Sequence, residues 1–357
     1  LHLLSRRQRQ MCIRDSFGVV LHAVIREVCD EIKKNGESYY LISEEKRREM
    51  VKRSVAAITD IYQNSILKDS SRNSFMIKRM EDLADRTVWA MGEQLKCGDF
   101  VPFVFEHKFN MEVGDGDRKQ LMSGTIDRVD ICENGTDVYV RIIDYKTGKK
   151  DFNIVKTYYG IDIQLMVYME AAMKLVAKMR PGKNVIPAGV FYYNISDPIV
   201  SATTESAEEI EDKIKGELRL KGMVNSDKDI AEKMDNTEGT SLNIPVSRKA
   251  DGGFDSRRSK VMNTEQFNIL GRFVDVRAID TADRIAGGDI RRSPYKDGQF
   301  SSCDRCPYGA VCGFSVDLPG CNYRKLKKFD DEVLWNNIKE GVDENGKKMD
   351  TGAEERD

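Results

Sequence analysis

Two acidic residues and a lysine in the middle of the chain have the types and the spacing that metal-dependent hydrolysis requires. Asp127 lies in the segment GTIDRVD, and Asp144 precedes Lys146 by two positions in the segment VYVRIIDYKTG. In a strand, Asp144 and Lys146 would point to one face, while Tyr145 points away and leaves its carbonyl oxygen nearby. Two carboxylates and a carbonyl oxygen suit a hard divalent ion such as Mg²⁺, and the Lys146 ammonium group can orient or activate a water beside it. The pattern predicts phosphodiester hydrolysis assisted by a divalent metal.

The segment that ends in Asp144 has the pattern of a buried strand. Val138, Val140 and Ile142 alternate along it, and Ile143 gives its other face apolar character as well. A strand that is apolar on both faces lies inside a sheet. The alternative, an ordinary solvent-exposed ion pair, fits such a strand less well.

The surrounding sequence predicts the order three helices, three strands, a helix and a strand. Apolar residues at helical spacing mark the helices, with Ser43 in a capping position, and the turn sequences GDGD and ENGT separate the strands. The expected helices cover residues 17–34, 43–67, 73–95 and 162–179, and the expected strands cover 101–111, 120–132, 136–145 and 185–193. This is the order of an α/β protein.

These motifs together resemble the nuclease motif of the PD-(D/E)XK superfamily, in its RecB-like branch. The segment Phe17–His22 is similar to the family's G-x-x-x-H motif, and Gly160–Tyr168 resembles its Q-x-x-x-Y motif. Glu106 lies on the strand that often carries a supporting acid in this branch. The resemblance implies a restriction-endonuclease-like PD-(D/E)XK core with helical additions.

The same resemblance implies a role for each matching residue. The ligands that it implies for a Mg²⁺ or Mn²⁺ ion are His22, Asp127, Asp144 and the carbonyl oxygen of Tyr145. Lys146 would act on the attacking water, while Gln164 and Tyr168, four positions apart on one helix face, would lie beside the metal and support the substrate. The alternatives are a packed or surface histidine at position 22 and ordinary core packing for the glutamine and tyrosine.

Three cysteines near the C-terminus have the spacing C-x2-C-x5-C: Cys303, Cys306 and Cys312. No signal peptide or membrane-spanning apolar run is evident, so clustered cysteines indicate metal ligands rather than disulfides. Zinc is the general expectation for such spacing, but three thiolates leave a fourth ligand to be supplied. The cysteines expected to be ordinary buried or half-buried thiols are Cys29, Cys97 and Cys132.

Over residues 17–328, the ordered motifs and the cysteines are most similar to the C-terminal nuclease domain of the AddB family, found in bacterial AddAB helicase–nucleases. That resemblance implies a [4Fe–4S] cluster on the three cysteines, with a fourth cysteine upstream of the domain. It also implies a cytoplasmic, metal-dependent DNA exonuclease that pairs with an AddA-like helicase–nuclease subunit as a heterodimer. The domain would cut a single strand emerging from unwound DNA during recombinational repair of double-strand breaks. ATP binding is expected of the full-length complex, and this chain has no Walker motif.

The first sixteen residues, LHLLSRRQRQMCIRDS, resemble translated sequencing-adapter read-through. Such a segment is excluded from fold prediction, so Cys12 is not counted as the fourth cluster ligand. The native sequence is then expected to begin near Phe17, truncated within a longer protein. Cys321 is the local alternative for the missing ligand.

The C-terminal half of the chain has a different character. Ser206 with Glu209, and Asn263 with Gln266, predict helix starts, whereas residues 223–260 are polar and predict a loop or flap with little core. The expected divisions are a scar at 1–16, a nuclease core at 17–197, a helical or flap insertion at 198–288, an iron–sulfur cysteine module at 289–328 and a charged, disordered tail at 329–357.

Bulk charge says little about the substrate. The formal net charge is −2, from 57 Lys and Arg against 59 Asp and Glu, so the chain is not a basic nucleic-acid-binding protein overall. Two alternatives to the AddB-type nuclease stay open. A Cas4-like iron–sulfur exonuclease shares the fold and the cysteine pattern, but residues 201–290 are long for such compact proteins. A non-catalytic, metal-stapled scaffold module would have no need of Asp127, Asp144 and Lys146.

Overall fold

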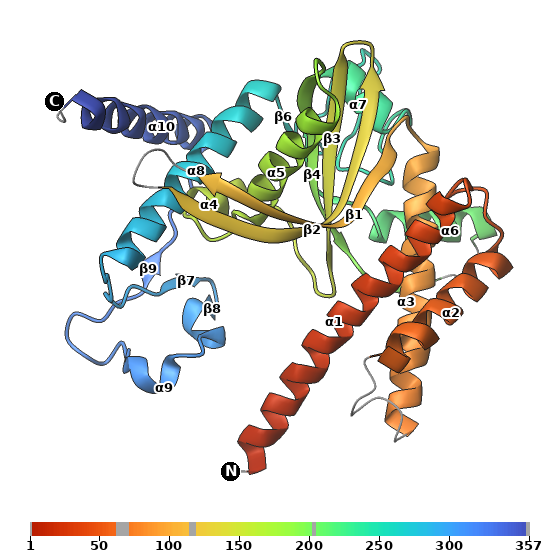
Figure 1. Ribbon diagram of the computed structural model, residues 1–357, viewed down its shortest axis with the longest axis horizontal. Helices are drawn as coiled ribbons and strands as arrows, with labels where there is room; N and C mark the ends of the chain where they lie inside the picture. The colour runs from red at the N-terminus through yellow and green to blue at the C-terminus, as the bar shows by residue number, and fades with distance from the viewer. Residues whose placement is uncertain (1, 62–70, 114–118, 202–204, 355–357) are drawn as a thin grey trace. The chain divides into compact units, whose positions relative to one another are not determined.

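The computed structural model describes the backbone of residues 2–61, 71–113, 119–201 and 205–354 (Figure 1). Side chains are described over the same ranges except at 2–16, 61, 71–73, 120, 305 and 344–354. The predicted GDGD turn, the predicted helix end at residue 67 and the side chain of Cys12 therefore lie outside the described residues.

The chain divides into two compact units that are each continuous in space but not in sequence. The first unit contains residues 1–109, 123–152 and 168–267. The second unit contains residues 110–122, 153–167 and 268–357. The division proposed from the sequence follows other boundaries and stays a prediction.

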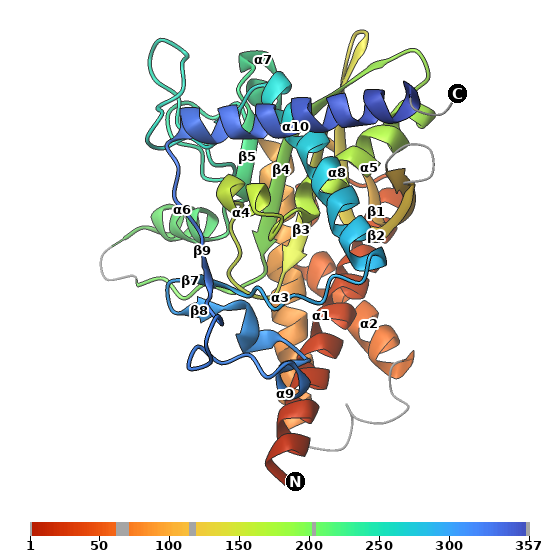
Figure 2. The same cartoon turned by 90° about the vertical axis from the view of Figure 1, so that its left-hand side faces the viewer.

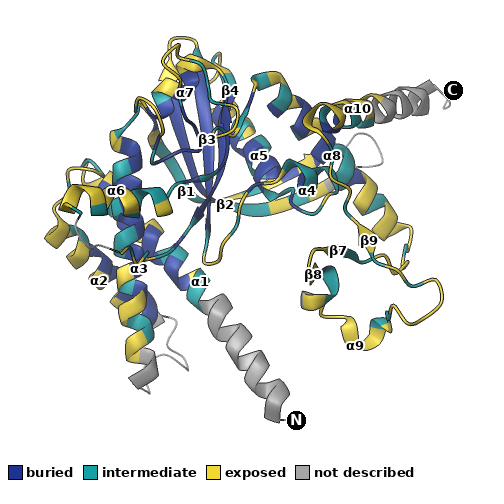
Figure 3. Cartoon of the chain, turned by 180° about the vertical axis from the view of Figure 1, so that it is seen from behind, coloured by how far each residue is buried: buried dark blue, intermediate teal, exposed yellow. Residues whose placement is uncertain are grey.

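The main sheet has six strands in the order β1-β2-β3-β4-β5-β6. Their bounds are β1 Val101–Val113, β2 Gln120–Asn134, β3 Asp137–Lys146, β4 Asn184–Asn194, β5 Lys221–Asn225 and β6 Val261–Met262. Strand β3 pairs with β2 antiparallel and with β4 parallel, so it lies inside the sheet. Every residue of β3 except its two ends is buried, which confirms the predicted strand that is apolar on both faces (Figure 3).

Three helices build the largest core against this sheet: α1 His2–Lys34, α2 Glu44–Ile61 and α3 Ser71–Lys96. The buried stripe of α1 repeats every three or four residues, as a helix face requires: Leu21, Val24, Val28 and Ile32. From β3 the alternate residues Tyr139, Ile143 and Tyr145 join the same core. Each such fully buried apolar side chain stabilises the fold by about 1.5–3 kcal/mol, so the packing of α1 on the sheet is held by many contacts.

Parallel pairing of β3 with β4 requires a crossover connection, and two helices provide it. These are α4 Ile154–Tyr158, which the sequence did not predict, and α5 Gln164–Met179 (Figure 1). The side chain of Asn153 caps α4 by accepting a hydrogen bond from the backbone N–H of Lys156 at 3.1 Å. In α5, Met169, Ala172 and Val176 are buried at helical spacing, which gives the crossover its own apolar face.

The region after β4 corrects one prediction. Helix α6 (Ala207–Glu217) begins with the predicted capping box of Ser206 and Glu209, which is confirmed. Residues 223–260, however, are not a loop with little core. They include most of β5 and the helix α7 (Lys228–Met234), and the core residues among them are Val224, Ile230, Ala231, Met234, Ile244 and Val246. The apolar residues there are too widely spaced for a periodic pattern, which is why the sequence hid them.

The second unit contains the rest of helix α8 (Thr264–Ala286) and the helix α10 (Asp331–Glu354). Asn263 and Gln266 exchange hydrogen bonds at the start of α8, so this predicted cap is confirmed. A small sheet in the order β8-β7-β9 joins Phe300–Ser301, Tyr295–Asp297 and Arg324–Lys325. Leu334 and Ile338 of α10 are buried, so the predicted disordered tail is wrong for residues 331–343. None of the helices in the described ranges has the length and apolar character needed to cross a membrane.

Candidate metal centre

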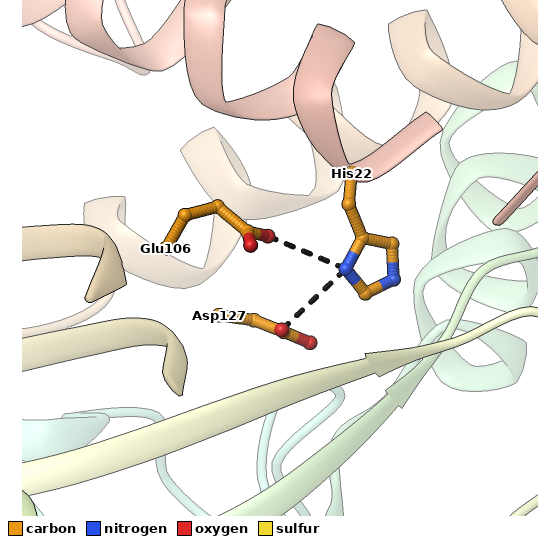
Figure 4. A group of neighbouring side chains, drawn as sticks. All are labelled: His22, Glu106 and Asp127. Atoms are coloured by element: carbon orange, nitrogen blue, oxygen red, sulfur yellow. Dashed lines mark ion pairs between the residues drawn. The ribbon is translucent and has the colours of Figure 1, made fainter. Parts of the chain in front are cut away.

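Three side chains from three elements of the first unit converge on one point (Figure 4). The Nδ1 atom of His22 lies 3.3 Å from Oε1 of Glu106 and 3.4 Å from Oδ1 of Asp127. One ligand atom from each residue lies within 4.8 Å of the other two. Among the described residues, no other group of three histidine, cysteine or acidic side chains is this close.

Helix α1 positions His22 through its buried neighbours. Leu21 and Ile25 are fully buried in the core, so the helix cannot rotate about its axis without losing them. The imidazole itself is half-buried, and its ring meets the ring of Tyr145 edge to face, with the centroids 5.8 Å apart. His22 therefore presents Nδ1 to the two carboxylates in a fixed orientation.

Strand β1 changes its backbone conformation at Glu106 to bring this side chain into the site. Glu106 has φ of 46°, and it is the one residue other than glycine with a positive φ in the described part of the chain. This left-handed conformation costs an L-amino acid about 1–2 kcal/mol. Strain of this kind persists where the surrounding structure enforces it, often at functional sites. The carboxylate of Glu106 thus reaches His22 from within a regular strand.

Asp127 on β2 is held by β3. Its Oδ2 atom accepts a hydrogen bond from the backbone N–H of Tyr145 at 2.6 Å, while Oδ1 faces His22. Burial of the Asp127 carboxylate is thereby compensated. The role predicted for the Tyr145 carbonyl as a metal ligand stays a prediction, whereas its ring packs in the core on the opposite face, as predicted.

Asp144 and Lys146 meet at the end of β3. Lys146 Nζ lies 2.5 Å from Asp144 Oδ2, which confirms that the two side chains share one face. Asp144 is almost fully buried. Burial and the charge of Asp127 raise the pKa of the Asp144 carboxyl to about 6, although Lys146 and His22 oppose this shift. Two carboxylates that raise each other's proton affinity are stabilised by a cation between them.

The predicted set of ligand side chains was His22, Asp127 and Asp144, and the structure modifies it. The compact group contains Glu106 in place of Asp144, because β1 turns its acid inward while Lys146 engages the Asp144 carboxylate. Burial lowers the pKa of His22, but hydrogen bonds and charges from Asp127 and Glu106 outweigh it and raise the pKa to about 10. The two carboxylates therefore hold a positive charge on the imidazole, and a divalent cation would satisfy the same pair.

The donor set fits the implied metal. An imidazole nitrogen and two carboxylate oxygens are ligands that Mn²⁺ accepts, and Mg²⁺ takes carboxylates together with waters. His22, Glu106 and Asp127 offer these atoms within 4.8 Å of one another. The described residues thus fit a hard divalent ion.

A buried ion network that the sequence analysis missed lies next to the site. Arg128 donates two hydrogen bonds to the carboxylate of Asp130, at 2.7 and 2.6 Å. Arg141 on β3 donates a third from Nε at 2.9 Å. All three side chains are at most 1 % exposed. The available signal was two charges, at i and i+2 of β2, opposite an arginine in an otherwise apolar strand.

Tyr168 packs beside the strand that carries Asp127. Its ring meets the ring of Phe109 edge to face at 5.7 Å. Gly124 lies beneath both rings, since a Cβ there would be 2.9 Å from Phe109 Cε1 and 3.3 Å from Tyr168 Cε1. Gln164 lies in the second unit, and its role beside the metal stays a prediction.

The C-terminal cysteines do not form a preorganised cluster site. Cys303 and Cys312 are half-buried, Cys306 is exposed, and all are free thiols, as is Cys321. No three of the described cysteines bring their sulfur atoms within 4.8 Å of one another. The residues as arranged therefore do not fit a [4Fe–4S] cluster. Of the cysteines predicted to be ordinary thiols, Cys29 and Cys132 are buried and Cys97 is half-buried, which confirms that prediction.

The fold and the site agree with the comparison against known families. The chain belongs to the PD-(D/E)XK nuclease superfamily, whose family profile matches residues 2–313. This match confirms the predicted superfamily and includes residues 2–16, whose foreign origin stays a prediction.

Relatives that are named as the AddB-type component of an ATP-dependent helicase/deoxyribonuclease are similar over nearly the whole chain. One from a Thermoanaerobacter species is 33% identical over 360 residues, which cover 97% of this chain and 31% of the relative. One from Lachnoclostridium phytofermentans is 33% identical over 363 residues, covering 99% and 31%. One from Clostridium botulinum is 33% identical over 337 residues, covering 91% and 29%. The resemblance to AddB is confirmed, and the chain spans about a third of the length of these relatives.

Proposed function

We propose that this chain is the nuclease domain of a longer helicase–nuclease subunit and that it hydrolyses DNA phosphodiesters with Mg²⁺ or Mn²⁺. The observation that carries the proposal is the group of His22, Glu106 and Asp127 beside the pair of Asp144 and Lys146. Membership of a nuclease superfamily supports it independently. A purely structural domain would gain nothing from a strained Glu106 aimed at a half-buried histidine.

Each side chain has a definite task in this proposal. His22, Glu106 and Asp127 would hold the cation, with Asp144 as a further ligand. When bound, the ion would polarise the scissile phosphate and lower the pKa of a bound water. Lys146 would orient the attacking water and stabilise the charge that develops on the phosphate, since its ammonium group lies at the edge of the site. The raised pKa of Asp144, about 6, falls when a cation replaces the proton.

The substrate and the partner follow from the relatives rather than from the site. Because those proteins carry helicase and deoxyribonuclease in their name, we assign to this chain a strand of DNA that a helicase has unwound. The full-length subunit would work with an AddA-like subunit in the cytoplasm during repair of double-strand breaks, as an exonuclease. Gln164 and Tyr168 would support the strand near the metal.

The iron–sulfur cluster implied by the C-x2-C-x5-C spacing needs a rearrangement in this chain. Cys303, Cys306 and Cys312 would have to converge and acquire a fourth ligand, either Cys321 or a residue of the longer protein. Anaerobic expression followed by iron and sulfide analysis tests this directly. Four irons per chain would support a cluster, and an iron-free protein with zinc or no metal would reject it.

A cleavage assay on end-labelled single-stranded DNA tests the catalytic proposal. The parent should cut with Mg²⁺ or Mn²⁺ and stop with EDTA. Asp144→Asn and Lys146→Ala should each lose about 100-fold or more in rate. Lys149→Ala is the matched control, because Lys149 is an exposed lysine three residues further on. A parent that is inert with every metal, or variants that cut like the parent, would favour the non-catalytic scaffold.

A further inference from the structure

The second unit contains a cavity whose lining differs from that of the metal centre. Its volume is about 770 Å³. It lies between the end of α4, the middle of α8, the segment at residues 324–329 and the first half of α10 (Figure 2). No residue of the proposed catalytic set lines it.

Aromatic rings form one side of this cavity. Tyr158 stacks on Phe273 with the centroids 5.5 Å apart and the planes within 9°. Phe329 meets Tyr158 edge to face at 5.5 Å and lies nearly parallel to Tyr159 at 6.3 Å. Phe273 is buried, whereas Tyr158, Tyr159 and Phe329 are half-buried and keep part of their surface open. The cavity thus offers flat aromatic surface to a ligand.

Two contacts fix these rings in place. The Tyr159 hydroxyl accepts a hydrogen bond from the backbone N–H of Lys327 at 3.0 Å, which ties α4 to the segment before α10. Gly341 allows α10 to approach Phe273, since a Cβ there would be 2.8 Å from Phe273 Cε2. The aromatic side of the cavity is therefore built rather than incidental.

Positive charge lines the cavity beside the rings. Its four cationic residues are Arg277, Arg324, Lys325 and Lys327, against the single acid Glu340. No ion pair is recorded for Arg277, Lys325 or Lys327 within the described ranges. The guanidinium group of Arg277 lies over Phe273 at 5.0 Å and over Tyr158 at 5.8 Å. Its buried Nε atom has no hydrogen-bond partner among the described residues. A buried donor in this state favours an anionic or carbonyl ligand.

Flat aromatic surface next to unpaired cations is the combination that binds single-stranded nucleic acid. The bases stack on the rings, and the phosphates meet the lysines and arginines. A cavity of about 770 Å³ falls in the range that accepts a small organic ligand such as a nucleotide. An acidic peptide would use the charges and leave the rings unused, and duplex DNA would not expose a base to them.

We propose that this cavity is a second DNA-binding site, which holds an unpaired nucleotide of single-stranded DNA. The base stacks on Tyr159 or Phe329, and Arg277, Lys325 and Lys327 contact the flanking phosphates. The inference rests on the proposed function for its choice of DNA as the ligand. It adds a site that grips the strand through its bases, whereas the metal centre acts on its backbone.

Binding in EDTA tests this site without cleavage. A fluorescent oligothymidylate of about 12 nucleotides is titrated into the full chain and into three variants, with anisotropy as the readout. Tyr159→Leu/Phe329→Leu should weaken binding by about 10-fold or more, because stacking is lost. Lys325→Ala/Lys327→Ala should weaken it and reduce the salt dependence by about two released counterions. Lys328→Ala/Lys339→Ala, two exposed lysines outside the cavity, should bind like the parent.

An abasic oligonucleotide of the same length separates stacking from bulk electrostatics. It should bind the parent about 10-fold more weakly than oligothymidylate and should bind the double leucine variant almost as well as the parent. Equal binding of the two oligonucleotides to the parent would overturn the inference, as would equal loss in the cavity lysine variant and its control. If the leucine variant fails to fold by circular dichroism, the paired lysine variants still decide, because those residues are exposed.

Failure of this site and failure of the proposed function give different results. A parent that cuts DNA with metal but shows no dependence on the cavity residues keeps its nuclease function and loses this site. A parent that binds through the cavity and never cuts keeps this site and loses the nuclease function. Duplex DNA that competes as well as single strands would contradict the role of an unpaired base.

Discussion

The carboxylate of Asp127 joins two elements at once: Oδ2 accepts the backbone N–H of Tyr145 at 2.6 Å, and Oδ1 lies 3.4 Å from His22 Nδ1. One side chain thus couples the pairing of β2 with β3 to the position of helix α1. The structural task needs only a hydrogen-bond acceptor. The proposed catalytic task needs a negative charge.

These two tasks separate in the variant Asp127→Asn. Asparagine keeps an acceptor for Tyr145 but loses the charge, so we expect the free energy of unfolding to change by less than about 1 kcal/mol and the cleavage rate to fall about 100-fold. Asp127→Ala should lose the same activity and, in addition, about 1–3 kcal/mol of stability, because the amide is left unpaired. Urea unfolding and cleavage of labelled DNA measure the two effects. Full activity in Asp127→Asn would remove this residue from the metal site.

The left-handed backbone at Glu106 predicts an inversion of the usual order of alanine and glycine. In an ordinary strand, glycine is less stable than alanine by about 0.5–1 kcal/mol. At φ of 46° alanine carries the steric cost of about 1–2 kcal/mol and glycine does not. Glu106→Gly should therefore unfold at a higher urea concentration than Glu106→Ala. The opposite order would show that the strand relaxes when the carboxylate is removed.

Metal binding should stabilise the protein through His22 and Glu106. Mn²⁺ at about 100 times its Kd contributes about 2.7 kcal/mol to the free energy of unfolding, so the melting temperature of the parent should rise on adding the ion and fall again with EDTA. His22→Ala and Glu106→Gln should show a much smaller rise, whereas Glu112→Gln, an exposed acid on the same strand, should respond like the parent. Equal shifts in all four proteins would place the ion elsewhere.

The buried network of Asp130 predicts how stability depends on pH. Burial raises the pKa of the Asp130 carboxyl, but the charges and hydrogen bonds of Arg128 and Arg141 outweigh it, so the pKa lies below its ordinary value. A depressed pKa in the folded state contributes stability above the unfolded pKa of about 3.9, and this contribution is lost as the pH falls through the folded value. Thermal unfolding between pH 7 and pH 2 measures this loss.

Removing the Asp130 charge at neutral pH isolates the same contribution. Asp130→Asn leaves two buried guanidinium groups without their counter-ion, which costs about 3–5 kcal/mol. The acid-induced loss should then be smaller in this variant than in the parent. A variant as stable as the parent at pH 7 would show that water or other groups compensate the two arginines.

Local sequence signals predicted much of the fold. Capping pairs such as Ser206 with Glu209 act within four residues, so they could be recognised without tertiary information. Alternation around Val140 and Ile142 correctly indicated a strand that is buried on both faces. The pairing of Asp144 with Lys146 followed from strand periodicity alone.

The errors arose where long-range geometry decides. The turn of Glu106 into the site depends on one positive φ that no neighbouring residue signals. Arg141 reads as an isolated charge until β3 pairs with β2 and places it beside Asp130. The core contributed by Ile244 and Val246 comes from a segment without regular periodicity. Cysteine spacing shows which residues can share a metal, but not whether the backbone brings their sulfur atoms together.

The residues of the metal centre are distant in sequence, and each arrives on a different element. His22 comes from α1, Glu106 from β1 and Asp127 from β2, while the amide of Tyr145 on β3 holds the last of these. Such non-local contacts form only after long loops of chain have closed, which is slow. A chain still emerging from the ribosome therefore has no complete centre until β3 has been synthesised and packed. The order of assembly protects the genome, because a half-made or misfolded copy of this nuclease domain cannot cut DNA.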